Sequence, residues 1–332
     1  MYCLDSAPAD RVAHISVVDR FQWQQSSIVA AGCALLAVCL ASSGACAHRD
    51  AIPRSVLPDI SGLAWIEGGR FLAVHDAKLP EEAGFPRVSL LDLPTGLDGL
   101  GWLPLAIEFD GSATSDLESA ARVPVDGRVL VLIAESTEEV AEKPFSNRIF
   151  LLEVSGDEVQ VVDHAEWPIA TTNVEGIAVA EAGGMLLFLY AERAHGKPSS
   201  EIRWAEMALD PLRFGPFRSA GRFASPDPSG PLARPVSALE IDAQGSLYAA
   251  SAEDPDDDGG PFRSSVYRIG RVTSEGGAPA VALDDAPTLV GILDGLKVEA
   301  IAARGREDGS VELWVGVDDE FYGGTLRRLP DR

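Results

Sequence analysis

The segment VEGIAVA, residues 174–180, carries the pattern that decides the fold of this chain. An aliphatic residue is followed by Ser or Glu, then by a small residue, then by another aliphatic residue. The same pattern occurs in ISGLAWI from residue 60, LESAARV from 117, VSALEID from 236 and VEAIAAR from 298. The Ser or Glu positions lie 57 or 62 residues apart, and such even spacing indicates an internal repeat.

Each copy of the pattern is followed by further β-prone runs. In the third copy these are MLLFLYAE, EIRWAEMAL and FRSAGRF, at residues 185–192, 201–209 and 217–223. Four short antiparallel strands that recur five times, with no amphipathic helical pattern, predict an all-β, five-bladed β-propeller of four-stranded blades. The last copy ends after its third strand. We therefore expect residues 49–58 to supply an N-terminal strand that closes the ring and covers the open sheet edge.

The first 47 residues differ from the rest of the chain. An apolar run at residues 28–47 ends in Ala45, Cys46 and Ala47, which fits a signal peptidase site. We expect a leader at 1–47 and one propeller domain at 48–332, exported to the periplasm or the cell exterior, with no transmembrane span in the mature protein. A lipid anchor at Cys46 is an alternative. The long, mixed-charge stretch before the run suggests that translation starts near Val17 or Val18.

Composition narrows the choice of partners. All four cysteines lie in the leader, so the mature domain has neither disulfides nor a thiolate metal site. The formal net charge of −24 disfavours binding to nucleic acid and anionic membranes and attracts cations. We expect a monomer whose partner is a small phosphorylated substrate, a protein or a glycan.

The Ser or Glu of each copy starts the innermost strand of a blade, so the five positions are expected to meet around one axis. They are Ser61, Glu118, Glu175, Ser237 and Glu299. Carboxylates this close repel one another unless a cation lies between them. Calcium prefers six to eight oxygen ligands, so the pattern predicts an axial Ca²⁺ site. The alternative is that the glutamates cap the strands by hydrogen bonding to neighbouring backbone amides.

The order Ser, Glu, Glu, Ser, Glu, together with LKVEAIA at residues 296–302, resembles the soluble calcium-activated nucleotidases, the five-bladed apyrases. The resemblance covers residues 55–329 as a pattern. It implies a calcium-dependent phosphohydrolase that acts on nucleoside di- or triphosphates or another phosphate ester. In that reading the phosphate is bound by Lys78, Arg193 and Lys297, and the general base is one of Asp76, Glu135 and Glu192.

The chain also departs from the nucleotidase pattern. Ser119 stands where that family has a tryptophan, and only Arg193 remains of an arginine pair. The negative net charge further disfavours capture of a polyphosphate. Two alternatives stay open. One is a non-catalytic, calcium-stabilised propeller that binds a protein or a glycan. The other is a phytase-like or esterase-like phosphoesterase, which the count of five blades disfavours.

The loop DPDDDGG, residues 254–260, places Asp254, Asp256 and Asp258 at alternate positions before a glycine. This spacing is typical of the first half of an EF-hand calcium loop. The twelfth position, however, is Ser265 instead of a bidentate glutamate. The loop is therefore expected at the rim of the propeller, either as a second, weaker calcium site or as a solvated acidic turn.

Overall fold

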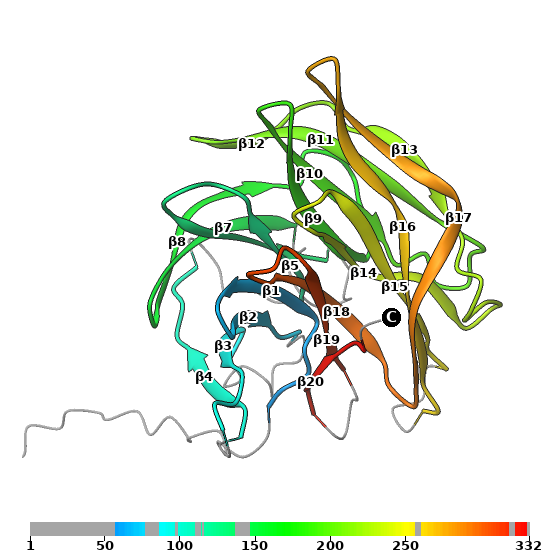
Figure 1. Ribbon diagram of the computed structural model, residues 1–332, viewed down its shortest axis with the longest axis horizontal. Helices are drawn as coiled ribbons and strands as arrows, with labels where there is room; N and C mark the ends of the chain where they lie inside the picture. Colours follow the sequence, from blue (N-terminus) through cyan, green and yellow to red (C-terminus); the bar gives the residue numbers. More distant parts are fainter. Residues whose placement is uncertain are drawn as a thin grey trace, which may run out of the picture. The chain divides into compact units, whose positions relative to one another are not determined.

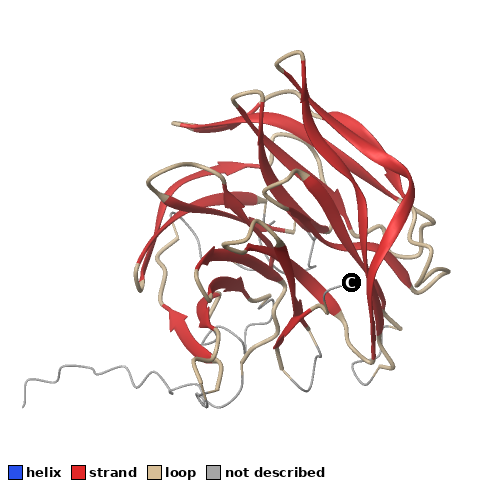
Figure 2. Cartoon of the chain, viewed as in Figure 1, coloured by secondary structure: helices blue, strands red, loops and turns tan. Residues whose placement is uncertain are grey.

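The computed structural model describes residues 57–76, 86–96, 99–109, 114, 116–136, 147–255, 260–318 and 323–330. The leader expected at 1–47 and most of the closing strand expected at 49–58 lie outside this part of the chain. The described segments are strands, turns and loops, without a helix (Figure 2). Within them, accordingly, no helix has the length and hydrophobicity to cross a membrane.

The strands pair in chain order into five antiparallel sheets, which are the blades. Blade 1 contains β1 (Gly62–Glu67), β2 (Arg70–Val74), β3 (Val88–Asp92) and β4 (Gly101–Leu105). Blade 2 contains β5 (Leu117–Val123), β6 (Val129–Glu135), β7 (Arg148–Ser155) and β8 (Glu158–Glu166). Blade 3 contains β9 (Val174–Ala182), β10 (Met185–Glu192) and β11 (Ser200–Leu209), with β12 (Leu212–Phe214) and β13 (Arg218–Phe223) both paired to β11.

Blade 4 contains β14 (Ala233–Ile241), β15 (Ser246–Glu253), β16 (Arg263–Glu275) and β17 (Ala278–Asp294). Blade 5 contains β18 (Val298–Gly305), β19 (Val311–Val317) and β20 (Thr325–Arg328). The first strands of the blades contact one another in a closed cycle, β1 to β5, β9, β14, β18 and back to β1. The five sheets therefore form a five-bladed β-propeller with these strands innermost, which confirms the predicted fold class (Figure 1).

The hydrophobic core lies between neighbouring blades. Strand β6 shows how the sequence builds it, because side chains alternate between the two faces of a strand. Val131 and Ile133 face blade 1, whereas Leu130 and Leu132 face blade 3. Both faces of each central strand are buried in this way. A continuous apolar run therefore replaces the alternation of apolar and polar residues that a half-exposed strand would show.

The small residue of the repeated pattern is explained by the approach of adjacent innermost strands. A Cβ atom on Gly176 would lie 2.7 Å from the backbone nitrogen of Leu239 in β14. A Cβ on Gly62 would lie 2.7 Å from the backbone nitrogen of Ala120 in β5. Since real Cβ atoms do not come this close to backbone, these positions admit only glycine without a shift of the strands.

Blade 5 has three strands within the described residues, as its sequence predicts. The segment that precedes β1 lies against this blade. The carbonyl of Leu57 accepts a hydrogen bond from the amide of Gly324 at 2.7 Å, and the amide of Ile60 donates to the carbonyl of Val317 at 3.3 Å. The two ends of the repeat array are thus hydrogen-bonded to each other where the ring closes.

Candidate functional site

The five positions of the repeated pattern come together at the starts of the innermost strands, and all are buried. Their side chains do not share one environment. The hydroxyl of Ser61 accepts a hydrogen bond from the amide of Asp76 at 3.2 Å. The hydroxyl of Ser237 donates to the carbonyl of Val298 in the next blade at 2.7 Å. Both serine hydroxyls therefore bond to neighbouring backbone, an amide in one case and a carbonyl in the other.

Two of the three glutamates are neutralised by basic side chains. In blade 3, Glu175 accepts a hydrogen bond from Arg193 Nε at 2.6 Å, and both side chains are largely buried. In blade 5, Glu299 lies 2.8 Å from Arg234 and 3.3 Å from Lys297. Burial by itself would raise the pKa of Glu299, but Lys297 and Arg234 outweigh it and lower the pKa to about 2.

The network around Glu299 extends to two aspartates. Lys297 Nζ contacts Asp318 at 2.8 Å and Asp254 at 3.7 Å. Arg234 also pairs with Asp254. Burial by itself would lower the pKa of Lys297, but Glu299 and Asp318 raise it above its usual value. Lys297 is therefore a charged member of a buried ion-pair network and is engaged with its own chain.

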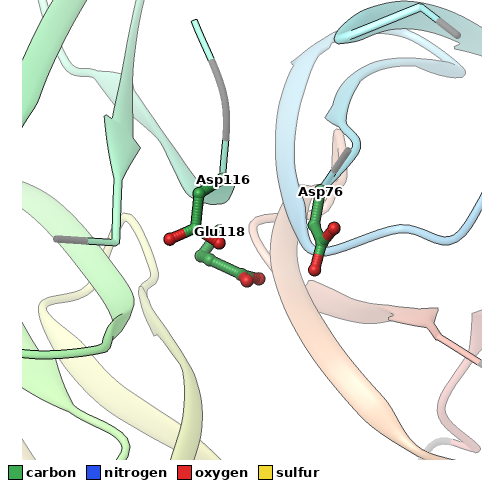
Figure 3. Close-up of side chains that lie close together, drawn as sticks. All are labelled: Asp76, Asp116 and Glu118. Carbon is green, nitrogen blue, oxygen red and sulfur yellow. The ribbon is translucent and has the colours of Figure 1, made fainter. Parts of the chain in front are cut away.

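The third glutamate, Glu118, belongs to a cluster of carboxylates. Asp76, Asp116 and Glu118 each offer an oxygen, and these atoms all lie within 4.8 Å of one another. Asp76 comes from blade 1, whereas Asp116 and Glu118 come from the start of blade 2, and the side chains converge from the two blades (Figure 3). Asp116 and Glu118 are buried and Asp76 is partly exposed. We call this set the carboxylate cluster.

Asp116 is held firmly in the cluster. Its backbone has a φ of 60°, which residues other than glycine rarely adopt. Its carbonyl accepts a hydrogen bond from the amide of Ser136 at 2.9 Å, and its carboxylate accepts one from the hydroxyl of the same serine. Strained backbone of this kind often occurs at functional sites. Asp116 was not among the residues predicted from the sequence, although its place two residues before the repeated Glu offered a signal.

The other acids suggested as general bases lie apart from the cluster. Glu135 is fully buried, where Arg148 NH2 donates to it at 2.8 Å and the hydroxyl of Thr114 at 2.7 Å. Glu192 accepts a hydrogen bond from the amide of Thr172 at 3.0 Å. A catalytic role for either stays a prediction that these contacts do not favour. Asp76 alone of the three suggested bases belongs to the carboxylate cluster.

The strand register explains why Asp76 reaches the carboxylate cluster whereas Glu135 and Glu192 lie apart from the starts of the innermost strands. Pairing with the innermost strands aligns Val74, Ala134 and Ala191 in their blades. Two residues further on stand Asp76, Ser136 and Arg193, which contact the start of the innermost strand. Glu135 and Glu192 lie one residue earlier, and adjacent residues of a strand point to opposite faces.

Three residues suggested from the sequence, Lys78, Asp256 and Asp258, lie outside the described residues. Asp254, the first acid of the rim loop, is buried and holds Arg234 and Lys297 as described above. The second calcium site at this loop stays a prediction. Arg234 and Asp318, which complete the ion-pair network, were not selected from the sequence. Arg234 does not stand at a repeated position, whereas Asp318 stands two residues after Gly316, the partner of Ala300, and so takes the place of Asp76 and Arg193 in its blade.

Comparison with protein-family models and with curated proteins found no match. Solved structures of similar fold were found. One is an α-L-arabinofuranosidase from Lactobacillus brevis, with 14% identity, coverage of 86% of this chain and 94% of that chain, and a TM-score of 0.50. Another is a thermostable family-43 glycoside hydrolase, with 13% identity, coverage of 83% and 90%, and a TM-score of 0.50. At these identities the likeness shows the fold.

The expected resemblance to calcium-activated nucleotidases is wrong, because the similar solved structures are propellers of glycoside hydrolases. The expectation of a phosphohydrolase fails with it. The geometry adds a physical reason, since Arg193 and Lys297, which were expected to bind phosphate, are engaged by Glu175 and by Asp318. The axial calcium site formed by all five repeat positions stays a prediction.

Proposed function

We propose that this protein is a carbohydrate-active propeller that hydrolyses glycosidic bonds at the carboxylate cluster. The observation that carries the proposal is the meeting of Asp76, Asp116 and Glu118 within 4.8 Å at the start of an innermost strand. Hydrolysis of a glycosidic bond is usually carried out by a pair of carboxyl groups that flank it. The likeness in fold to solved glycoside hydrolases supports this choice.

The environments of the three acids suggest a division of roles. Asp76 is partly exposed, so it can contact water and is suited to activate the attacking molecule. Glu118 is buried and is suited to protonate the leaving oxygen. Asp116, held by Ser136, orients the other two. Glu175 and Glu299 are less suited to these roles, because Arg193, Arg234 and Lys297 hold their carboxylates.

The test is hydrolysis of aryl glycosides and plant polysaccharides by the full chain and by Asp76→Asn, Asp116→Asn and Glu118→Gln. Loss of a general acid or base usually lowers the rate by about 100-fold to 10,000-fold, so Asp76→Asn and Glu118→Gln are expected to fall in that range. Asp116→Asn, which removes the orienting carboxylate, is expected to lower the rate less. Glu158→Gln, an exposed carboxylate in β8 of blade 2, is the matched control. Equal rates in Glu118→Gln and Glu158→Gln would contradict the proposal.

A divalent cation at the same cluster is a second candidate function, favoured by the closeness of three like charges. Calcium accepts carboxylate oxygens in flexible geometry, so the calcium expected from the sequence is proposed here. Millimolar Ca²⁺ is expected to raise the melting temperature of the wild type and not that of Glu118→Gln. An equal shift in both proteins would locate the cation elsewhere. Binding of a glycan without hydrolysis by any variant would favour the non-catalytic alternative.

A further inference from the structure

A cavity of about 190 Å³ lies in blade 3, where β10 ends and β11 begins. Its walls include the side chains of Tyr190, Glu192, Lys197, Glu201, Arg203 and Arg222. Glu192 pairs across the sheet with Val174, which immediately precedes Glu175. The cavity therefore opens at the same end of blade 3 as the start of its innermost strand.

Two of the basic side chains in the cavity, Arg222 and Lys197, form no close ion pair within the part of the chain that the structure describes, although Arg222 lies across the sheet from Glu201. Arg222 donates from Nε to the hydroxyl of Ser199 at 2.9 Å and from NH2 to the carbonyl of the same residue at 2.8 Å. These neutral groups orient its guanidinium without cancelling the charge. Lys197 is exposed and forms no ion pair with a described residue.

The acids of the cavity are already engaged. Arg203 NH2 lies 3.0 Å from Glu201. The hydroxyl of Ser219 is the main cause of a lowered pKa of Glu201, and Arg203 and Arg222 lower it further. Glu192 accepts the amide hydrogen bond from Thr172. The charges of the six side chains sum to about +1 at neutral pH, in a chain whose net charge is −24.

The cavity also offers a neutral hydrogen-bond donor. The ring of Tyr190 is buried, with its centroid 5.2 Å from that of Trp167. Burial is the main cause that raises the pKa of Tyr190 to about 12, so the hydroxyl keeps its proton at neutral pH. A cavity of about 190 Å³ has room for a single sugar ring.

We infer that this cavity is a subsite for an acidic sugar residue, whose carboxylate is bound by Arg222 and Lys197. The planar guanidinium of arginine matches a carboxylate with two parallel hydrogen bonds. The hydroxyls of the sugar meet Tyr190 and the paired Glu201 and Arg203. The inference rests on the proposed function, because it assigns the class of glycan that the propeller takes: one that carries a uronic acid.

The test measures binding apart from hydrolysis. The full chain with Glu118→Gln is titrated with the methyl glycosides of glucuronic and galacturonic acid and with those of glucose and galactose, followed by ligand-observed NMR. At least one acidic sugar is expected to bind about 10-fold more tightly than its neutral counterpart. Arg222→Gln and Lys197→Gln, added singly, are each expected to remove most of that preference. Arg213→Gln, an exposed arginine of β12 in the same blade, is the matched control.

Three outcomes would overturn the inference: equal binding of acidic and neutral sugars, equal loss of preference in Arg213→Gln and Arg222→Gln, or displacement of the uronate by equimolar inorganic phosphate. The last would show a general anion site. Failure of the proposed function is separate, because it is the absence of hydrolysis by the wild type. Selective uronate binding by a chain that hydrolyses no glycan would support the subsite while contradicting the proposed activity.

Discussion

Equivalent residues of a repeat can have opposite electrostatic environments, and the three glutamates of this propeller show it. Glu175 and Glu299 face basic side chains, whereas Glu118 faces Asp76 and Asp116. A buried carboxylate with two cations stabilises the fold through their attraction. A carboxylate beside two others adds repulsion between like charges, which proteins tolerate at functional sites.

Glu118→Gln and Glu299→Gln are therefore expected to differ in stability. Removing the charge of Glu299 leaves Arg234 and Lys297 buried with less compensation, which typically costs about 3 to 5 kcal/mol of unfolding free energy. Removing the charge of Glu118 relieves its repulsion with Asp76 and Asp116, so the loss of unfolding free energy should be smaller than in Glu299→Gln. Urea unfolding of both variants measures the difference, and an equal loss in the two would show that the carboxylate cluster is a structural site.

His75 predicts a loss of stability in mild acid. It is fully buried, with Nδ1 2.7 Å from the carbonyl of Asp59 and Nε2 2.8 Å from the hydroxyl of Ser89. Burial is the main cause that lowers its pKa from 6.5 to about 4. Below pH 6.5 the unfolded chain takes up a proton that the folded chain does not, so the unfolding free energy falls as the pH drops toward 4. The loss reaches about 2 kcal/mol at pH 5.

The measurement is the difference in unfolding free energy between pH 8 and pH 5, in wild type and in His75→Gln. In His75→Gln this difference should be smaller by about 2 kcal/mol, because the variant has no imidazole to titrate. His164→Gln, an exposed histidine of β8, serves as the control and should keep the wild-type difference. A pH dependence that is the same in all three proteins would refute the assignment to His75.

At the scale of elements, strand register decides which side chains reach the site. Ala191 pairs with Gly176, so Arg193, two residues further on, lies at the start of β9 and contacts Glu175. Glu192 lies between them and lines the cavity in blade 3 instead. A shift of one residue exchanges the two faces of a strand. The glycines of the innermost strands also matter, because their lack of a side chain lets adjacent innermost strands pack closely.

Gly176→Ala is expected to destabilise the propeller. The new methyl group would lie 2.7 Å from the backbone nitrogen of Leu239, so β9 and β14 must move apart. Overpacking of this kind costs about 1 to 3 kcal/mol. Gly99→Ala, at a position where a Cβ meets nothing within 4 Å, should leave the melting temperature unchanged. Equal melting temperatures for the two variants would mean that the strands adjust freely.

At the scale of the whole propeller domain, stability depends on the contact that joins the last blade to the first. Phe71, Leu91 and Ala302 belong to the buried cluster there, and the ring of Phe71 lies 5.6 Å from that of Trp314. This interface corresponds to the other four between neighbouring blades, but its two sides are distant in sequence. Its formation completes the cycle of innermost strands.

Phe71→Ala should weaken the whole ring. Removal of a buried phenylalanine costs about 3 to 5 kcal/mol, equivalent to a fall in melting temperature of roughly 10 °C for a domain of this size. Scanning calorimetry should show one transition at the lower temperature. Leu103→Ala, an exposed residue of β4 in the same blade, is the control. Two separate transitions in Phe71→Ala would show that the blades do not unfold as a single unit.

The propeller, the number of its blades and the position that starts each innermost strand could be predicted from the sequence. These follow from local hydrophobic patterning and from a period that repeats along the chain. Only the folded chain shows which of the three glutamates joins the carboxylate cluster, and which residues neutralise the other two. Asp76 reaches Glu118 from blade 1, and Arg234 reaches Glu299 from blade 4. Sequence spacing carries no information on such contacts, because charges interact through distance in the folded chain.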